Sequence, residues 1–173
     1  STTSGIDIHF PSSWFLASTP SNPAAAADNN FYGDALLSNN IAYNRHRAHL
    51  AWYSVDPIFG HPQSNTPSHI KNDPDAMSDH RTRIIYEQEL YPNKEVLASE
   101  DTRLTVLNLS YYPEERGPYN IDTTRSYTNQ GRFADPASNW AGIMRRLDNT
   151  DFETANIEYI QFWMLDPTLT NPE

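Results

Sequence analysis

Apolar and polar residues alternate along several short stretches of the chain, and a period of two residues is typical of β-strands. The pattern predicts strands over residues 47–55, 83–91, 103–111 and 140–147, and a shorter alternation indicates one more over residues 6–10. No helical period continues for more than about a dozen residues. We therefore expect short helices at most, one of them within residues 34–41.

The last apolar stretch, Ile157–Leu165, differs from the others because both of its alternating faces are apolar. Such a strand is typically buried on both sides. We expect Phe162 and Trp163 to anchor opposite sides of a sheet. If Trp163 is buried, Trp163→Ala should lower the free energy of unfolding by about 3–5 kcal/mol.

Turns and loops separate these stretches. Pro113 and the Gly117-Pro118 pair predict a turn, and residues 60–80 and 121–138 are long polar loops. Short strands joined by long loops indicate a mainly β protein, an antiparallel sandwich that is jelly-roll-like or galactose-binding-like. We expect an irregular segment over residues 1–33 and a β-rich module over residues 34–173, the module being an incomplete part of a much larger chain.

Composition narrows the class of protein. The net charge of −10 argues against binding to nucleic acid, whose phosphates would be repelled. Cysteine is absent, so a disulfide framework is excluded. No apolar run is long enough for a transmembrane helix. No signal peptide is evident at the start, which reads as an excised or processed form.

One loop carries candidate metal ligands: Asp73, Asp75 and Asp79 lie close together. Calcium prefers several oxygen ligands, so these carboxylates are a candidate calcium site, although the EF-hand spacing is absent. The alternative is that they cap helices and form Asx turns. The six histidines are scattered and predict no zinc site.

Candidate catalytic groups are few. Glu114 and Glu115 could supply the two carboxylates of a glycosidase, but neighbouring residues on one turn rarely converge on one substrate atom. We favour an ion pair between Arg116 and a nearby carboxylate. The sequence shows no Ser-His-Asp triad and no phosphate-binding glycine loop. We therefore assign no catalytic or cofactor-binding residue and predict that the protein is not an enzyme.

The four tryptophans, Trp14, Trp52, Trp140 and Trp163, allow two interpretations. Aromatic residues on strands most often belong to the core. They could instead form a sugar-stacking platform, which would make the chain a carbohydrate-binding β-sandwich module, with or without a bound calcium ion. Trp140 lies beside the polar Asn139 and is the residue that best fits the second interpretation.

Long aromatic-rich motifs resemble one known family. They are Leu50–Pro57, His69–Pro74, Glu89–Asn93, Tyr112–Asn120, Trp140–Arg145, Thr150–Glu153 and Asn156–Pro167. Together they resemble the SprA/Sov family, the very large outer-membrane translocon proteins of the type IX secretion system of Bacteroidetes. The likeness covers most of residues 40–167. Ala141 stands where the family more often has glycine, and residues 24–27 do not match.

The resemblance implies a role in transport and no reaction. The parent protein would be a giant single-chain β-barrel in the outer membrane that exports folded cargo and supports gliding motility. Its partners would be plug and shuttle proteins of the system and secreted cargo. This chain would be a non-catalytic module of that cell-envelope protein, facing either side of the membrane. We expect structural roles for Arg116, Gly117, Pro118, Tyr119, Asn120, Trp140, Phe162 and Trp163.

Overall fold

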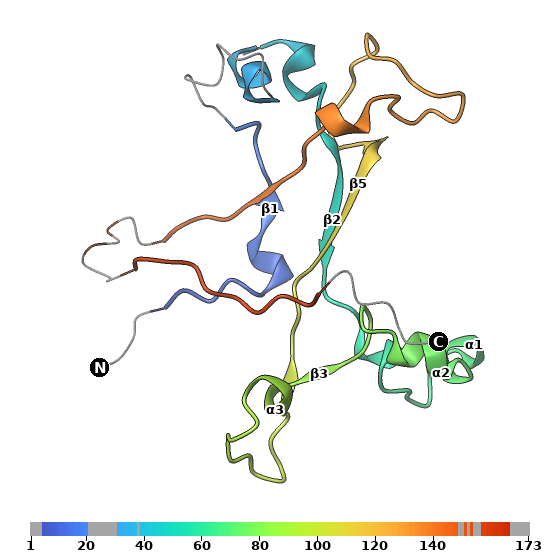
Figure 1. Cartoon of the computed structure of the whole chain (residues 1–173), viewed down its shortest axis with the longest axis vertical. Helices are drawn as coiled ribbons and strands as arrows, with labels where there is room; N and C mark the ends of the chain where they lie inside the picture. Colours follow the sequence, from blue (N-terminus) through green and yellow to red (C-terminus); the bar gives the residue numbers. More distant parts are fainter. Residues whose placement is uncertain are drawn as a thin grey trace. The chain divides into compact units, whose positions relative to one another are not determined.

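The structure is a computed structural model that describes residues 5–20, 31–37, 39–148, 151, 153 and 157–166. The chain divides into two compact units. One unit comprises Pro11–Tyr53 and Asn108–Leu147, and the other comprises Ser1–Phe10, Ser54–Leu107 and Asp148–Glu173. Each unit is described by itself below (Figure 1).

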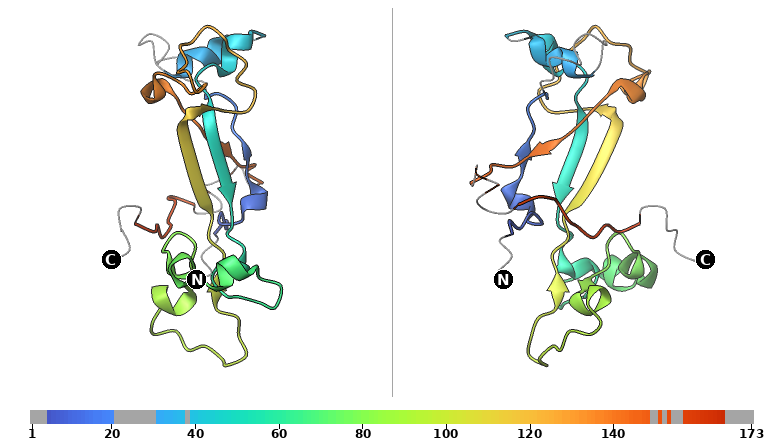
Figure 2. Two further views of the ribbon diagram at one scale, coloured as in Figure 1. Left: turned by 90° about the vertical axis from the view of Figure 1, so that its right-hand side faces the viewer. Right: turned by 60° about the vertical axis from the view of Figure 1, so that its left-hand side comes forward.

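The unit built from Pro11–Tyr53 and Asn108–Leu147 is organised around one antiparallel strand pair. Strand β2 (Ala48–Tyr53) pairs with β5 (Asn108–Arg116), and the two run side by side in each view (Figures 1 and 2). The prediction of a strand over residues 47–55 is confirmed. The strand predicted over residues 103–111 is split in two: Arg103–Leu104 form a short strand of their own, β4, and β5 begins at Asn108 and continues through the predicted turn to Arg116.

Strand β5 tolerates Pro113 because the ladder is interrupted there. The register pairs His49 with Tyr112 and Ala48 with Arg116, so residues 113–115 bulge out between two paired positions. A proline has no N–H to donate and is accepted at bulges and sheet edges. The expected turn therefore begins only after Arg116.

The rest of this unit consists of short elements. Strand β1 (Phe15–Leu16) pairs antiparallel with β6 (Ile143–Met144), which is all that forms of the strand predicted over residues 140–147. The 3-10 helices are η1 (Pro11–Ser13), η3 (Phe31–Leu36), η4 (Ile41–Asn44) and η6 (Pro136–Ser138). The side chain of Asn40 caps η4 by accepting from the N–H of Ala42 at 2.9 Å.

The other unit holds the α-helices and one small strand pair. Its elements are η5 (Pro57–Phe59), α1 (Ser68–Lys71), α2 (Pro74–Ser78), β3 (Ile85–Tyr86), α3 (Glu87–Leu90) and β4 (Arg103–Leu104), with β3 and β4 antiparallel. The strand predicted over residues 83–91 is wrong after Tyr86. The side chain of Glu89 accepts from the N–H of Tyr86 at 3.0 Å and starts α3 there. Residues 5–10 form no strand.

The expected buried strand at Ile157–Leu165 is wrong for the described structure. Residues 157–166 form neither helix nor strand. The side chains of Phe162 and Trp163 are 68% and 65% exposed. A strand with two apolar faces needs paired strands beside it and layers on both sides, and the described sheets are all two-stranded.

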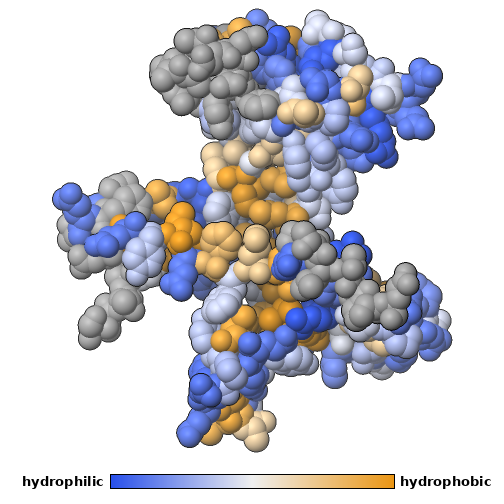
Figure 3. Space-filling model, viewed as in Figure 1, coloured by the Kyte–Doolittle hydropathy of each residue, from blue (hydrophilic) through white to orange (hydrophobic). Residues whose placement is uncertain are grey.

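Few apolar side chains are buried anywhere in the described part of the chain. Ala48 and Phe133 are the buried hydrophobic residues, and both belong to the unit of β2 and β5. Apolar side chains are correspondingly visible on the surface (Figure 3). The described chain has short antiparallel sheets and few, short helices, which is consistent with a mainly β protein. No helix in the described ranges has the length and hydropathy to cross a membrane.

Candidate functional site

The turn that follows β5 lies directly against β2. The N–H of Gly117 donates to the carbonyl of Arg47 at 3.0 Å. A Cβ atom at this position would lie 2.3 Å from the carbonyl oxygen of Ala48, so the close approach requires glycine. Tyr119 adopts φ +61° and leaves its ring 76% exposed. Pro118 is exposed as well.

Asn120 links this turn to the start of β2. Its side chain is buried, and Nδ2 donates to the carbonyls of Arg45 at 3.1 Å and Arg47 at 2.8 Å. Arg116 donates from Nη1 to the carbonyl of Asn120 at 3.3 Å, and its guanidinium lies 4.7 Å from the centre of the Tyr127 ring. The expected ion pair of Arg116 is wrong, because none of the ion pairs between described residues involves it.

The long polar loop over residues 121–138 is held by one arginine. The guanidinium of Arg125 lies 4.6 Å from the ring centre of the buried Phe133. It donates to the carbonyls of Arg45 and Asp135, each at 3.1 Å, and to the side chains of Ser138 and Asn139. This arginine satisfies acceptors at the C-terminal end of the loop and in the segment before β2, and therefore fixes the end of the loop against that segment.

Asp122 starts the same loop with a buried carboxylate. The carboxylate accepts from the hydroxyl of Thr124 at 2.8 Å and from the N–H of Arg125 at 3.2 Å. Burial by itself raises the pKa of Asp122, but the hydrogen bonds from Thr124 and Arg125 outweigh it, so the pKa lies below its usual value. The charged form of Asp122 is thus the form that the fold stabilises.

Arg47 is a buried arginine at the entry to β2. It donates from Nη1 to the carbonyl of Ala17 at 2.6 Å, and from Nε and Nη2 to Oδ1 of Asn44 at 3.1 Å and 2.9 Å. Its guanidinium lies 4.6 Å from the ring centre of Trp140. Burial lowers the pKa of Arg47.

Trp140, a residue of the predicted strand, forms an isolated parallel bridge with Arg47. Its N–H donates to the carbonyl of His46 at 2.9 Å, and its carbonyl accepts from the N–H of Ala48 at 2.8 Å. The ring is half-buried, and no hydrogen-bond partner of Nε1 is found in the described structure. The ring of Trp140 therefore packs over the guanidinium of Arg47.

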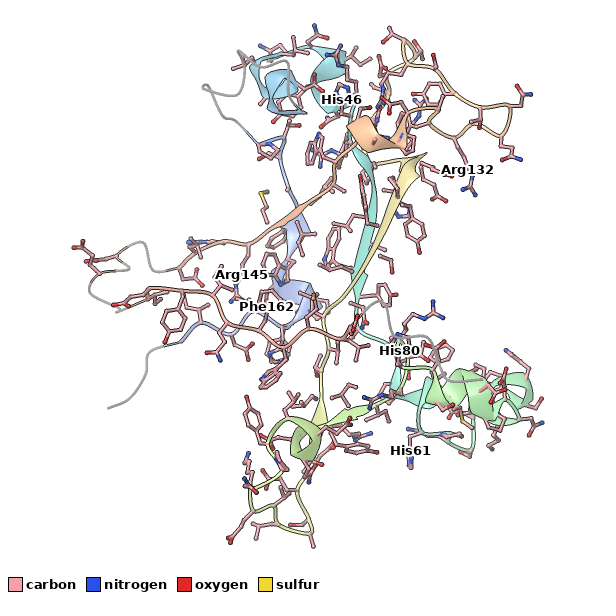
Figure 4. All side chains as sticks on the ribbon, in the orientation of Figure 1. His46, His61, His80, Arg132, Arg145 and Phe162 are labelled. Carbon is pink, nitrogen blue, oxygen red and sulfur yellow. The ribbon has the colours of Figure 1, made fainter. Side chains whose placement is uncertain are left out.

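A buried carboxylate also holds the segment that precedes β2. Asp34 accepts from Nε of Arg45 at 3.0 Å, and its second oxygen contacts Nδ1 of His46. Figure 4 shows His46 at the start of β2. Together with Arg47, Asn120 and Arg125, these contacts form a polar cluster in which most donors and acceptors are used within the unit.

The β2–β5 pair has two unlike faces. Residues opposite each other in an antiparallel pair share a face. Its polar face carries His49, Ala51 and Tyr53 of β2 with Asn108, Ser110 and Tyr112 of β5. Its apolar face carries Leu50, Trp52, Leu109 and Tyr111. On the polar face, the rings of His49 and Tyr112 stack at 5.1 Å, and the hydroxyls of Tyr53 and Ser110 are 3.0 Å apart.

The two neighbouring glutamates do not converge on one point. Glu114 pairs with Arg132 at 2.9 Å, and Glu115 lies 3.2 Å from Nδ1 of His49. Arg132 comes from the loop beside the end of β5 (Figure 4). Each carboxylate thus has its own basic partner, an arrangement that differs from the facing carboxylates of a glycosidase.

The acidic loop that was a candidate calcium site lies in the other unit and forms helix caps and turns. Asp73 accepts from the N–H of Ala76 at 2.9 Å and caps α2. Asp79 accepts from the N–H and guanidinium of Arg81, and this partner lowers the pKa of Asp79 to about 2. Asp75 lies in the first turn of α2. No group of three or more potential metal ligands converges among the residues that the structure describes.

The sequence did not reveal the three residues that organise the cluster: Asp34, Arg47 and Arg125. Each is a common polar residue in a stretch without a distinctive pattern, and its partners are distant in sequence. Gly117 and Asn120 could be predicted from the sequence, because glycine and asparagine are typical of turns and glycine allows close backbone approaches.

Comparisons with known proteins add no assignment to this geometry: no model of a protein family matches the sequence, and no curated protein matches it significantly. The candidate site thus consists of the polar cluster at the start of β2 and the two unlike faces of the β2–β5 pair.

Proposed function

We propose that this chain is a non-catalytic module of an outer-membrane translocon of the type IX secretion system, of the SprA/Sov kind. It would contribute to protein export and gliding motility within the cell envelope. The sequence motifs over most of residues 40–167 support the family. The observation that carries the proposed role is the amount of apolar surface left exposed beside only two buried apolar residues in the described structure, Ala48 and Phe133.

That imbalance fits a module that packs within a larger assembly. Exposed apolar patches mark surfaces that other protein or membrane components cover. The most exposed apolar side chains include Tyr159, Ile160, Phe162, Trp163 and Met164, which belong to one continuous segment. The polar cluster around β2 also favours a structural role, because its arginines and carboxylates are engaged with one another and with backbone groups.

We also propose that the parent protein completes the jelly-roll-like sandwich. The β2–β5 pair supports this proposal because one of its faces is polar and the other apolar. That is the division seen in the outer strands of a sandwich, where one face meets a second sheet and the other meets water.

The proposal is tested by site-specific photocrosslinking in cells, in the full-length parent protein. Ser64 and Asn129 are exposed and lie one in each unit, so a photoreactive residue at either position samples its surroundings. Crosslinks to secreted cargo or to plug and shuttle subunits are expected from at least one of them. The buried Ala48 serves as the control and should give none. Labelling at both exposed sites without any secretion component would contradict the proposal.

A second candidate function is carbohydrate binding on the polar face of β2–β5. Tyr53 and Tyr112 are each exposed by more than two-fifths on that face, beside the polar groups of His49, Asn108 and Ser110. Aromatic rings with polar neighbours are the usual means of holding a sugar. Calorimetric titration with a panel of glycans tests it. Binding should be weakened at least tenfold by Tyr112→Ala and unaffected by Tyr119→Ala, whose ring is outside the strands.

A further inference from the structure

Backbone groups at alternate residues of β2 point to its outer edge, and at Leu50 and Trp52 no described residue bonds to them there. Gly117 donates to the carbonyl of Arg47, which shows that residue 47 faces β5. His46 and Ala48 bond instead to Trp140, on the opposite edge of the strand. Because backbone groups alternate in direction along a strand, Leu50 and Trp52 also face away from β5. Neither makes a backbone hydrogen bond to a described residue outside the strand ladder.

The chain itself begins a third strand on this edge and then leaves it. Trp140 forms a parallel bridge in which its N–H and its carbonyl bond to His46 and Ala48, the residues before and after Arg47. Two residues later, the carbonyl of Gly142 accepts from the N–H of Ala17, and β6 continues along β1. The edge at Leu50 and Trp52 is therefore a direct continuation of a ladder that is already in use.

The outer edge of β5 is less suited to a further strand. Pro113 has no N–H to donate, and its carbonyl accepts from Nδ2 of Asn139 at 2.7 Å. A strand added to β5 would meet this interruption directly after Tyr111. The edge of β2 has neither a proline nor a lysine or arginine between Ala48 and Tyr53, the devices that commonly prevent strand addition.

We propose that the edge of β2 at Leu50 and Trp52 binds an extended segment of another polypeptide by strand addition. The free N–H and C=O groups specify an extended backbone. The apolar face, with Leu109 56% and Tyr111 45% exposed, specifies apolar side chains at alternate positions of that segment. The net charge of −10 favours a segment flanked by basic residues. This inference does not depend on the translocon proposal.

Amide hydrogen exchange, followed residue by residue by NMR on the full chain, tests the proposal. The probe is a short peptide of alternating threonine and valine with a lysine at each end. In the free protein, the amides of Leu50 and Trp52 should exchange faster than those of Ala51 and Tyr53, which face β5. Saturating peptide should slow Leu50 and Trp52 by roughly tenfold or more and leave Leu109 and Tyr111 unchanged.

Two controls identify the contact as strand addition. A peptide with proline in place of each valine should give no protection, because it cannot pair along an edge. In the protein, Leu50→Thr keeps the outward N–H and should still bind, whereas Leu50→Pro removes it and should abolish binding. If Leu50→Pro fails to fold, the exchange pattern of the unaltered protein and the proline peptide decide the question.

Three results would overturn the inference. One is unchanged exchange at Leu50 and Trp52 with saturating peptide. Another is strong protection of both amides in the free protein at every concentration, which would mean that the chain itself covers the edge. The third is protection that appears only as protein concentration rises, which would assign the edge to a second copy of this chain.

Discussion

Single residues hold the turn after β5 to the start of β2, and they do so through contacts that allow few substitutions. Gly117 leaves no room for a side chain, and Asn120 uses both hydrogens of its amide on backbone carbonyls. Buried polar groups of this kind stabilise a fold only while every partner is present.

Gly117→Ala should destabilise the protein strongly. The added Cβ would overlap the carbonyl of Ala48, which is backbone and cannot move aside alone. Overpacking of this kind costs about 1–3 kcal/mol or more of unfolding free energy, measurable by urea titration. Gly33→Ala is the matched control, because no atom lies within 4 Å of the added carbon. Equal stability of the two variants would show that the turn does not approach β2 this closely.

Asn120→Asp should also destabilise the protein, by about 1–3 kcal/mol near neutral pH, since a carboxylate cannot donate to the carbonyls of Arg45 and Arg47. Asn129→Asp adds the same charge at an exposed position and should have little effect. Urea midpoints of both variants check the expectation. A loss as small in Asn120→Asp as in Asn129→Asp would rule out the amide as the link.

Asp122 should make stability depend on pH. Its pKa in the folded protein lies below its usual value, near 3.9 in an unfolded chain. The charged carboxylate therefore stabilises the fold above about pH 4, and this contribution is lost as the pH falls below that value. Asp122→Asn should be less stable than the parent near neutral pH and lose less stability on acidification.

The comparison uses urea midpoints at several pH values. Asp79 and Asp101, whose pKa values are lowered to about 2 by Arg81 and Arg103, contribute equally to both proteins. The difference between the two pH profiles therefore reports Asp122 alone. Parallel profiles would mean that the pKa of Asp122 is the same in the folded and unfolded chain.

At the scale of elements, pairing decides which stretches become strands. Residues 47–55 and Ile157–Leu165 have similarly strand-like sequences, yet only the first has a paired neighbour among the described residues. Residues 83–91 lose the second half of their strand to the Glu89 contact that starts α3. Apolar pattern alone therefore sets where a strand is possible, and the available partner sets where one forms.

Because Trp163 is exposed, Trp163→Ala should cost much less stability than the sequence predicted for a buried residue. Trp163→Ala should lower the free energy of unfolding by less than about 1 kcal/mol, because surface substitutions cost little. Phe133→Ala should cost about 3–5 kcal/mol, because this ring is 2% exposed and carries the guanidinium of Arg125. Denaturant titration of the two variants gives the comparison. A loss of several kcal/mol in Trp163→Ala would instead support the buried strand that the sequence predicted at Ile157–Leu165.

At the scale of the whole molecule, exposed apolar surface is the dominant feature, and it should make the isolated chain associate. Six exposed large apolar side chains lie within residues 159–165, around Phe162 and Trp163. Replacing both residues with serine should reduce concentration-dependent association in sedimentation velocity experiments, while circular dichroism stays unchanged. Leu97→Ser removes a single exposed residue and is the control. Equal association in all three proteins would contradict this expectation.

The sequence by itself determined the β-rich character, the position of β2, the existence of the turn with Gly117 and the polar loop over residues 121–138. The loop predicted over residues 60–80 is wrong in part, because α1 and α2 form within it. These features depend on local properties: the alternation of side chains, the φ preferences of proline and glycine, and the polarity of short stretches. They can be read without knowing which residues meet. The polar and apolar faces of β2 also follow from its alternation alone.

Only the tertiary structure decided which residues organise the candidate site. Asp34, Arg47 and Arg125 acquire their roles from partners that are distant in sequence, such as Ala17 for Arg47 and Asn139 for Arg125. The same is true of the edge of β2 at Leu50 and Trp52, where no described residue bonds because the chain leaves the ladder after Trp140. Burial and pairing are properties of contacts between distant segments, and a local pattern does not contain them.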